Sequence, residues 1–395
     1  MIRRENKEME NNSRTMYLCI HALQVAPVSC INRDDTGTPK TCVYGGTSRM
    51  RVSSQCWKRA IRMYLKDKYN DSGVRTKAIL YELAGRLAEA TGCDSETARQ
   101  FVKEKLEEAK IIAGDKKKKE KGSSKKAKEA SENEGTQSEK AKDTSAFFSR
   151  QQIDALSALL IEKFGEANAD KPAEEPEKKK TKEKKFPDRL AEACKNNPSA
   201  SELLFGRMFA SNPDLNYDAA CQVAHTFSVN EVYDEPDYFT VVGDIKKEET
   251  GSGSDYLDTK LFNSGILYRF ADVNLSQGSE LRNEQYMVDA AQVASQFLEA
   301  FVLSMPTGSA NAYANMTVPE TVIVELRDDV PVSFAPAFAK AIEGDDICGT
   351  AISEMAAYED KISRLYGAPV RKWVLGEVSL KELCRQVEEE INGRL

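Results

Sequence analysis

A concentration of basic residues between Asn32 and Arg62 is the strongest chemical signal in this sequence. The stretch reads NRDDTGTPKTCVYGGTSRMRVSSQCWKRAIR, whereas the whole chain of 395 residues has a formal net charge of −7. From Met16 to Lys66 there are eight basic residues and two acidic ones, a local excess of six positive charges. Clustered positive charge attracts polyanions. The sequence therefore predicts a nucleic-acid-binding surface on an otherwise acidic protein.

A glycine pair, two serines and a helix start accompany these cations. Gly45 and Gly46 indicate a tight turn that would also let a phosphate approach the backbone. Ser53 or Ser54 is a candidate N-cap for a helix over 55–67, whose free amide groups would favour an anion. We expect a groove that binds the nucleic-acid backbone without reading its sequence. Its predicted residues are Arg49, Arg51, Ser53, Ser54, Lys58 and Arg62.

The segment GRMFA at 206–210 is a second candidate for nucleic-acid contact. Arg207 could bind a phosphate, and Met208 or Phe209 could act as an apolar wedge or a stacking platform for bases. On residue types alone, core packing is the favoured interpretation of Met208 and Phe209. A hairpin predicted at 226–262, with a GSGS tip, could reach over a bound strand or be a mobile surface loop.

Asp34 and Asp35 are an adjacent carboxylate pair in a predicted loop. Such a pair could hold a divalent cation beside a phosphodiester, as in a metal-dependent RNA nuclease. The favoured alternative is structural: an Asx-turn, or a salt bridge to Arg33 or Lys40.

Composition and motifs argue against several other classes of protein. The chain lacks P-loop, dinucleotide-binding and serine-hydrolase patterns. It has two histidines, His21 and His225, which we expect to be packed, and nine cysteines without a C-x-x-C pair, which we expect to be reduced. No apolar run is long enough to span a membrane, and the first residues do not form a signal peptide. We therefore expect a cytoplasmic protein without metal, cofactor or membrane association.

Hydrophobic periodicity predicts alternating strands and helices around these candidate sites. Strands are predicted at 16–25, 48–52, 201–211, 265–275 and 320–328. Helices are predicted at 55–67, 74–113, 147–166, 187–197, 217–227, 282–305, 332–342 and 379–392, where Ser379 and Glu382 form a capping-box pattern. This order indicates an α+β fold, with a sheet covered by helices on one side.

Several longer motifs extend this pattern across the chain: NRDD-x-G-x-P-K, V-Y-G-G, R-M-R-V-S-S-Q-x-W-K-R-A-I-R, GRMFAS, YDAACQVAHTFSVNEV, DYFTVVGD, LFNSGILYRFADVNL and VPVSFAPAFAKAI. Together they resemble the CasC-type backbone subunit of the type I-E CRISPR Cascade complex. The resemblance covers nearly the whole chain except the Lys- and Glu-rich insertion and the two ends. The chain departs from the family at Thr47, Ser48 and 308–314, because members of the family often have basic residues at these positions.

The resemblance implies a right-hand architecture with a ferredoxin-like, RNA-recognition-type palm, a helical fingers insertion and a β-hairpin thumb. Copies would stack head to tail along a CRISPR RNA, kink it at regular intervals and present it to target DNA beside other Cascade subunits. The implied division is a disordered lead (1–15), palm (16–66), fingers (67–186, with disordered segments at 114–145 and 167–185), palm with the thumb (187–378, thumb 226–262) and a C-terminal helix (379–395).

Residue roles follow from the matching motifs. The residues implied to touch the guide backbone are Lys40, Ser53, Gln55, Lys58, Arg59 and Arg62, and Met208 is implied to be the wedge between bases. Type III backbone subunits resemble this fold and use a loop aspartate to cut RNA, so Asp34 or Asp35 would serve the nuclease alternative. A protein-interaction module with charged tethers is a third possibility.

Overall fold

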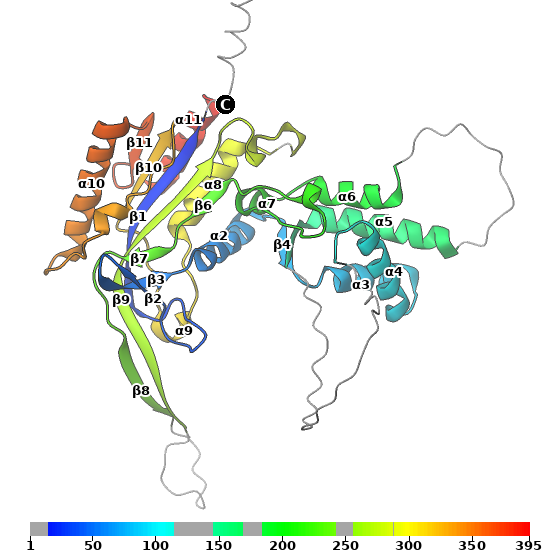
Figure 1. The fold of residues 1–395 in the computed structure, drawn as a ribbon, viewed down its shortest axis with the longest axis horizontal. Helices are drawn as coiled ribbons and strands as arrows, with labels where there is room; N and C mark the ends of the chain where they lie inside the picture. Colours follow the sequence, from blue (N-terminus) through cyan, green and yellow to red (C-terminus); the bar gives the residue numbers. More distant parts are fainter. Residues whose placement is uncertain (1–14, 114–144, 169–183, 242–255, 287) are drawn as a thin grey trace, which may run out of the picture. The chain divides into compact units, whose positions relative to one another are not determined.

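The computed structural model describes residues 15–113, 145–168, 184–241, 256–286 and 288–395. Two compact units are distinguished (Figure 1): a sheet unit formed by Met1–Asp71 and Ala219–Leu395, and an insert unit formed by Ser72–Asp218. The predicted disordered segments, the N-terminal lead and the GSGS tip fall almost entirely outside the described residues.

An antiparallel sheet forms the centre of the sheet unit, in the order β11-β10-β1-β9-β7-β3-β2, with β6 and β8 also paired to β9. Its inner strand β1 is buried along most of its length, as expected for a strand rich in apolar residues and covered on both faces. The strands are β1 (Tyr17–Ser29), β2 (Thr41–Tyr44), β3 (Thr47–Val52), β6 (Cys221–Val223), β7 (Thr226–Ser228), β8 (Glu235–Val241), β9 (Tyr256–Asn274), β10 (Thr321–Arg327) and β11 (Arg371–Val374). The predicted mixture of helices and antiparallel strands is confirmed.

Helices cover both faces of this sheet, and not one face as predicted. Successive strand residues point to opposite faces: Tyr268 belongs to the core beneath Met355 of α10, whereas Arg269 stacks on Trp57 of α2 and Phe301 of α8. Helix α10 (Ile347–Tyr366) had no counterpart in the sequence prediction. The remaining helical elements of this unit are α2 (Ser54–Tyr69), α8 (Ala290–Leu303), α9 (Ala310–Tyr313), α11 (Leu380–Asn392), η2 (Glu280–Arg282), η3 (Glu284–Tyr286) and η4 (Ala335–Phe338).

The predictions for 217–227, for 201–211 and for the start of 74–113, which forms β4 with β5 as its partner, are wrong. Residues 217–227 are not helical, because Cys221–Val223 and Thr226–Ser228 form β6 and β7 against β9. Residues 201–211 are not a strand, because Ser199 and Glu202 form a capping box that starts helix α7 (Ala200–Phe205). In the first case tertiary pairing overrides a helical pattern.

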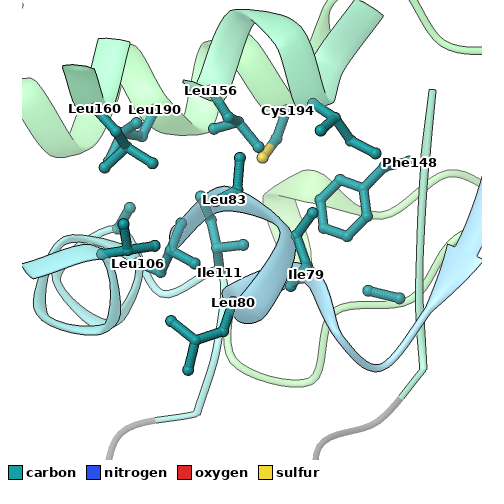
Figure 2. Packing of buried hydrophobic residues seen from close by; sticks show 14 of the residues in the cluster. Ile79, Leu80, Leu83, Leu106, Ile111, Phe148, Leu156, Leu160, Leu190 and Cys194 are labelled. Carbon is teal, nitrogen blue, oxygen red and sulfur yellow. The ribbon is translucent and has the colours of Figure 1, made fainter. Parts of the chain in front are cut away.

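In the insert unit, helices α3, α4, α5 and α6 pack around one apolar core (Figure 2). Leu83 of α3 faces Leu156 of α5 and Cys194 of α6 across this core. Residues 187–218, assigned by resemblance to the palm, fall in this unit. Its elements are β4 (Gly73–Thr76), α3 (Ile79–Thr91), α4 (Ser95–Glu108), β5 (Ala146–Ser149), α5 (Arg150–Asn168), α6 (Phe186–Lys195), α7 and η1 (Pro213–Leu215). In the part of the chain that the structure describes, no helix has the length and apolarity needed to cross a membrane.

Candidate nucleic-acid interface

The β2–β3 hairpin begins the candidate interface. Gly45 and Gly46 form its two-residue turn with φ angles of 61° and 86°, which glycine adopts without strain. A Cβ at Gly45 would lie 1.5 Å from the carbonyl oxygen of Ala339. Glycine is therefore required at position 45 because the chain comes close to it at Ala339. The prediction that Gly45 lets a phosphate approach the backbone is wrong.

Arg49 is buried beneath the hairpin and does not line the groove. Its side chain has no exposed surface. The guanidinium donates to the carbonyl oxygens of Ser228 at 2.9 Å, Val229 at 2.6 Å and Phe338 at 3.3 Å. Arg49 therefore joins β3 to the segments after β7 and in η4, and the prediction that it binds RNA is corrected.

Arg51, two residues further along β3, remains half-exposed. Its guanidinium donates to the carbonyl oxygen of Thr41 at 3.3 Å and lies 3.4 Å from Nδ1 of His225. The same imidazole nitrogen accepts from the backbone N–H of Ser54 at 3.4 Å. His225 is exposed at the start of α2, and not packed within a helix as predicted.

Helix α2 presents an apolar face inward and a cationic face outward. Trp57, Ile61 and Leu65 are buried, as their helical spacing predicts. Ser53 is the predicted N-cap, and its hydroxyl accepts from the backbone N–H of Cys56 at 3.3 Å. Of the other predicted contact residues on α2, Gln55 and Arg59 are exposed, whereas Ser54, Lys58 and Arg62 are half-buried.

Four cations at the first turns of α2 form what we call the cationic turn: Lys40, Arg51, Lys58 and Arg59. Across the described ranges, the side chains of Lys40, Lys58 and Arg59 enter no hydrogen bond or ion pair. Their clustering is visible in their effect on one thiol: burial raises the pKa of Cys56, and the charges of Arg59 and Lys40 partly lower it. This surface can therefore attract an anion.

The same charges act on His225. Partial burial lowers its pKa below the ordinary value of 6.5, and the charges of Arg51 and Lys40 lower it further. A neutral imidazole that accepts at Nδ1 carries its proton on Nε2. His225 thus adds a hydrogen-bond donor to the cationic turn. Alternation of apolar and polar residues through CQVAHTF was the sequence signal that could have identified the short strands β6 and β7, between which His225 lies.

One buried contact and one partly exposed cluster hold α2 in place. The Arg269 guanidinium of β9 lies 3.7 Å from the ring centroid of Trp57, a cation–π contact within the core. Near the other end of α2, the Glu299 carboxylate of α8 accepts from Lys68, Tyr64 and Tyr69. The helix that carries the cationic turn is therefore fixed to both the sheet and α8.

The carboxylate of Asp34 is engaged in its own loop. Oδ1 accepts from the backbone N–H of Thr36 at 2.9 Å and of Thr38 at 3.0 Å, and both threonine hydroxyls donate to the carboxylate. These bonds, led by that from the Thr36 hydroxyl, lower the pKa of Asp34 to about 2. This is the Asx-turn arrangement that the sequence favoured; Asp35 beside it is exposed.

In the insert unit, the loop after α7 exposes one predicted site residue, Met208, and buries another, Arg207. Met208 is 76% exposed, so the core-packing interpretation of this side chain is wrong, whereas Phe209 is buried. Arg207 is 3% exposed and forms an ion pair with Glu202 at 3.0 Å. The prediction that Arg207 meets a phosphate is corrected, because its guanidinium lies inside the unit.

The hairpin formed by β8 and β9 projects from the sheet unit (Figure 1), and its strands pair from Glu235↔Phe262 to Val241↔Tyr256. It begins at Glu235, later than the predicted 226, because Thr226–Ser228 belongs to the sheet as β7. Tyr233, Tyr238 and Leu257 are exposed on or beside it. These side chains could contact an extended ligand or a neighbouring molecule.

Comparison with known proteins agrees with the motifs. No curated protein matches the chain. A solved chain of a "CRISPR RNA-guided surveillance complex, pre-nicking" is 32% identical, with a TM-score of 0.72, and the match covers 96% of this chain and 100% of that one. A second, from a "CRISPR RNA-guided surveillance complex", is 28% identical, with a TM-score of 0.65 and coverage of 95% and 99%. Residues 18–392 match the family described as CT1975-like protein, and the chain belongs to that family.

Proposed function

We propose that this protein is a non-catalytic scaffold of a CRISPR RNA-guided surveillance complex, a CasC-type backbone subunit of type I-E Cascade. Several copies bind one CRISPR RNA by its phosphate backbone and present it for pairing with target DNA. The cationic turn is the observation that carries this proposal, because its four charges are half-buried or exposed and enter no ion pair with the described residues, on an otherwise acidic chain. The similarity to chains of surveillance complexes supports the same role.

The kind of residue at this surface suits a scaffold. Sequence recognition in such complexes belongs to the guide, so the protein needs contacts to phosphate and ribose and few to base edges. Lys40, Arg51, Lys58 and Arg59 supply charge, and Gln55 and His225 supply neutral polar groups. No arrangement for reading a particular base is required.

The architecture supports a right-hand assignment as part of the proposal. The antiparallel sheet with α2 and α8 serves as the palm, the insert unit as the fingers and the β8–β9 hairpin as the thumb. Copies of the chain stack head to tail, and each thumb lies over the guide beside the next palm. Met208 separates bases at the resulting kinks.

A metal-dependent RNA nuclease is the alternative. Asp34 is engaged by four hydrogen bonds within its loop, which favours a structural role for this carboxylate. Incubation of the assembled complex with complementary RNA and magnesium distinguishes the two functions. We expect intact RNA, whereas regularly spaced cuts that disappear in Asp34→Ala or Asp35→Ala would establish the nuclease.

The scaffold proposal is tested by the salt dependence of guide binding. For a single strand, the slope of log affinity against log salt changes by about 0.7 for each phosphate neutralised. We expect Lys58→Ala with Arg59→Ala to weaken guide binding and to flatten this slope by roughly 1.4. The matched control is Lys361→Ala with Lys381→Ala, exposed cations on α10 and α11, which should leave the slope unchanged. Equal slopes for both double variants would contradict the proposal.

A further inference from the structure

We propose that Arg207 is a positioning residue that holds Met208 outward as a fixed apolar projection against the bases of a bound RNA. The inference rests on the proposed function and assigns a second residue to the wedge. Arg207 and Phe209 are 3% and 4% exposed, whereas Met208 between them is 76% exposed. Met208 therefore stands in water between two buried neighbours, where its side chain is accessible to a ligand.

The main chain on both sides of Met208 is held by hydrogen bonds. Arg207 and Tyr217 form a two-way bridge, with the Arg207 N–H donating at 3.1 Å and the Tyr217 N–H donating at 3.0 Å. On the other side, the Phe209 N–H donates to Oδ1 of Asn216 at 2.5 Å. Met208 therefore projects from a backbone that cannot easily rotate it inward.

The Arg207 side chain secures this bridge from inside the unit. Its guanidinium lies 4.1 Å from the ring centroid of Tyr217 and 5.1 Å from that of Phe209. Nη1 donates to Glu202 and to Gln152, each at 3.0 Å, and Nε donates to the carbonyl oxygen of Leu215 at 2.9 Å. A planar guanidinium can stack and make these bonds together, whereas the point charge of a lysine cannot.

Glu202 is in turn fixed at the start of α7. Its Oε2 accepts from the backbone N–H of Ser199 at 2.8 Å, and the Ser199 hydroxyl accepts from the N–H of Glu202 at 3.2 Å. The capping box that begins α7 therefore sets the position of the carboxylate that Arg207 binds. A chain of contacts thus connects the start of α7, through Glu202 and Arg207, to the loop that carries Met208.

The surface beside Met208 indicates how the projection acts. A pocket there, lined by Ile79, Ile111 and Phe209 among others, has a volume of about 40 Å³. This is room for about one water molecule and far too little for a nucleobase. In the proposal Met208 acts by separating adjacent bases and not by holding one in a pocket, and the flexible thioether can adapt to any two neighbouring bases.

The test uses the full-length protein assembled with guide RNA, and it measures the chemical reactivity of each guide base. Asn216→Ala removes the acceptor for the Phe209 N–H, and Asn216→Asp retains an acceptor. Arg207→Lys keeps the charge and loses the stack. We expect Asn216→Ala and Arg207→Lys to lose most of the reactivity contrast between displaced and stacked bases, as Met208→Ala does, while guide affinity stays within about two-fold. Asn216→Asp should restore the wild-type contrast.

The outcomes separate this inference from the proposed function. If Met208→Ala itself leaves the reactivity pattern unchanged, the wedge and the positioning role both fail. If Met208→Ala abolishes the contrast while Asn216→Ala and Arg207→Lys retain it, the wedge stands and the positioning role of Arg207 is overturned. If Arg207→Lys does not fold, the comparison of Asn216→Ala with Asn216→Asp tests whether the held backbone positions Met208.

Discussion

Strand β3 and the loop around Met208 use arginine and methionine in opposite ways. In the R-M-R sequence at 49–51, Met50 is buried and Arg51 remains accessible beside other free cations. In the R-M sequence at 207–208, the arginine is buried in an ion pair and the methionine is exposed. The first region offers charge to a polyanion, and the second offers an apolar side chain on a backbone that charge holds in place. Burial, and not residue type, decides which role an arginine has.

The largest effect that tests this comparison is expected at Glu202. Glu202→Ala leaves the Arg207 guanidinium buried without its carboxylate, which should destabilise the insert unit by about 3–5 kcal/mol. Hydrogen exchange of the amides in α5 and α7 measures this loss. Glu162→Ala is the matched control, because Glu162 pairs with Arg189 on the surface of the same unit, where such pairs contribute about 0–1 kcal/mol. Equal protection in both variants would show that the buried pair does not stabilise the loop.

The second largest effect distinguishes the two arginines of β3, Arg49 and Arg51. Arg49→Ala removes a guanidinium donor from the buried carbonyl oxygens of Ser228, Val229 and Phe338, of which that of Val229 keeps the N–H of Ile342, and should lower the free energy of unfolding by on the order of 3 kcal/mol. Arg51→Ala should change stability by about 0.5 kcal/mol or less but weaken guide binding. Urea unfolding and a binding titration at fixed salt measure the two quantities. A variant of Arg49 that is fully stable and defective only in guide binding would reverse our assignment.

The smallest effect concerns His225 in the cationic turn. Its folded-state pKa lies below 6.5, so the unfolded chain binds the proton more readily, and stability rises with pH until the ordinary pKa is passed. His225→Asn keeps an acceptor for the Ser54 N–H and removes the titration. Thermal unfolding of this variant at about pH 5 and pH 7 should therefore show a smaller difference than the wild type. An unchanged difference would mean that His225 is not coupled to its cationic neighbours.

The sequence indicated the α+β class, the N-cap at Ser53 and the buried stripe of Trp57, Ile61 and Leu65, because these depend on local spacing. It did not indicate which arginines are buried. The burial of Arg49 depends on the carbonyl groups of Ser228 and Phe338, which are 179 and 289 residues away in the sequence. Such long-range contacts cannot be predicted from local periodicity.

The wrong assignments have the same origin. The segment CQVAHTF became two short strands because β9 offered open backbone groups to it. A strand over 201–211, as predicted, would place Glu202 and Arg207 on opposite faces, so the ion pair that buries Arg207 does not follow from that prediction. The S-x-x-E pattern at Ser199 was the local signal that would have placed Glu202 in the first turn of a helix.

Strand β9 has a mechanical consequence. It is one continuous strand of 19 residues, about 60 Å of extended backbone, whose outer half forms the projecting hairpin and whose inner half contains Arg269. Because Arg269 is stacked on Trp57, this single strand joins the projecting hairpin to the first turn of α2. A load on the hairpin is therefore expected to act along β9 on the helix that carries the cationic turn.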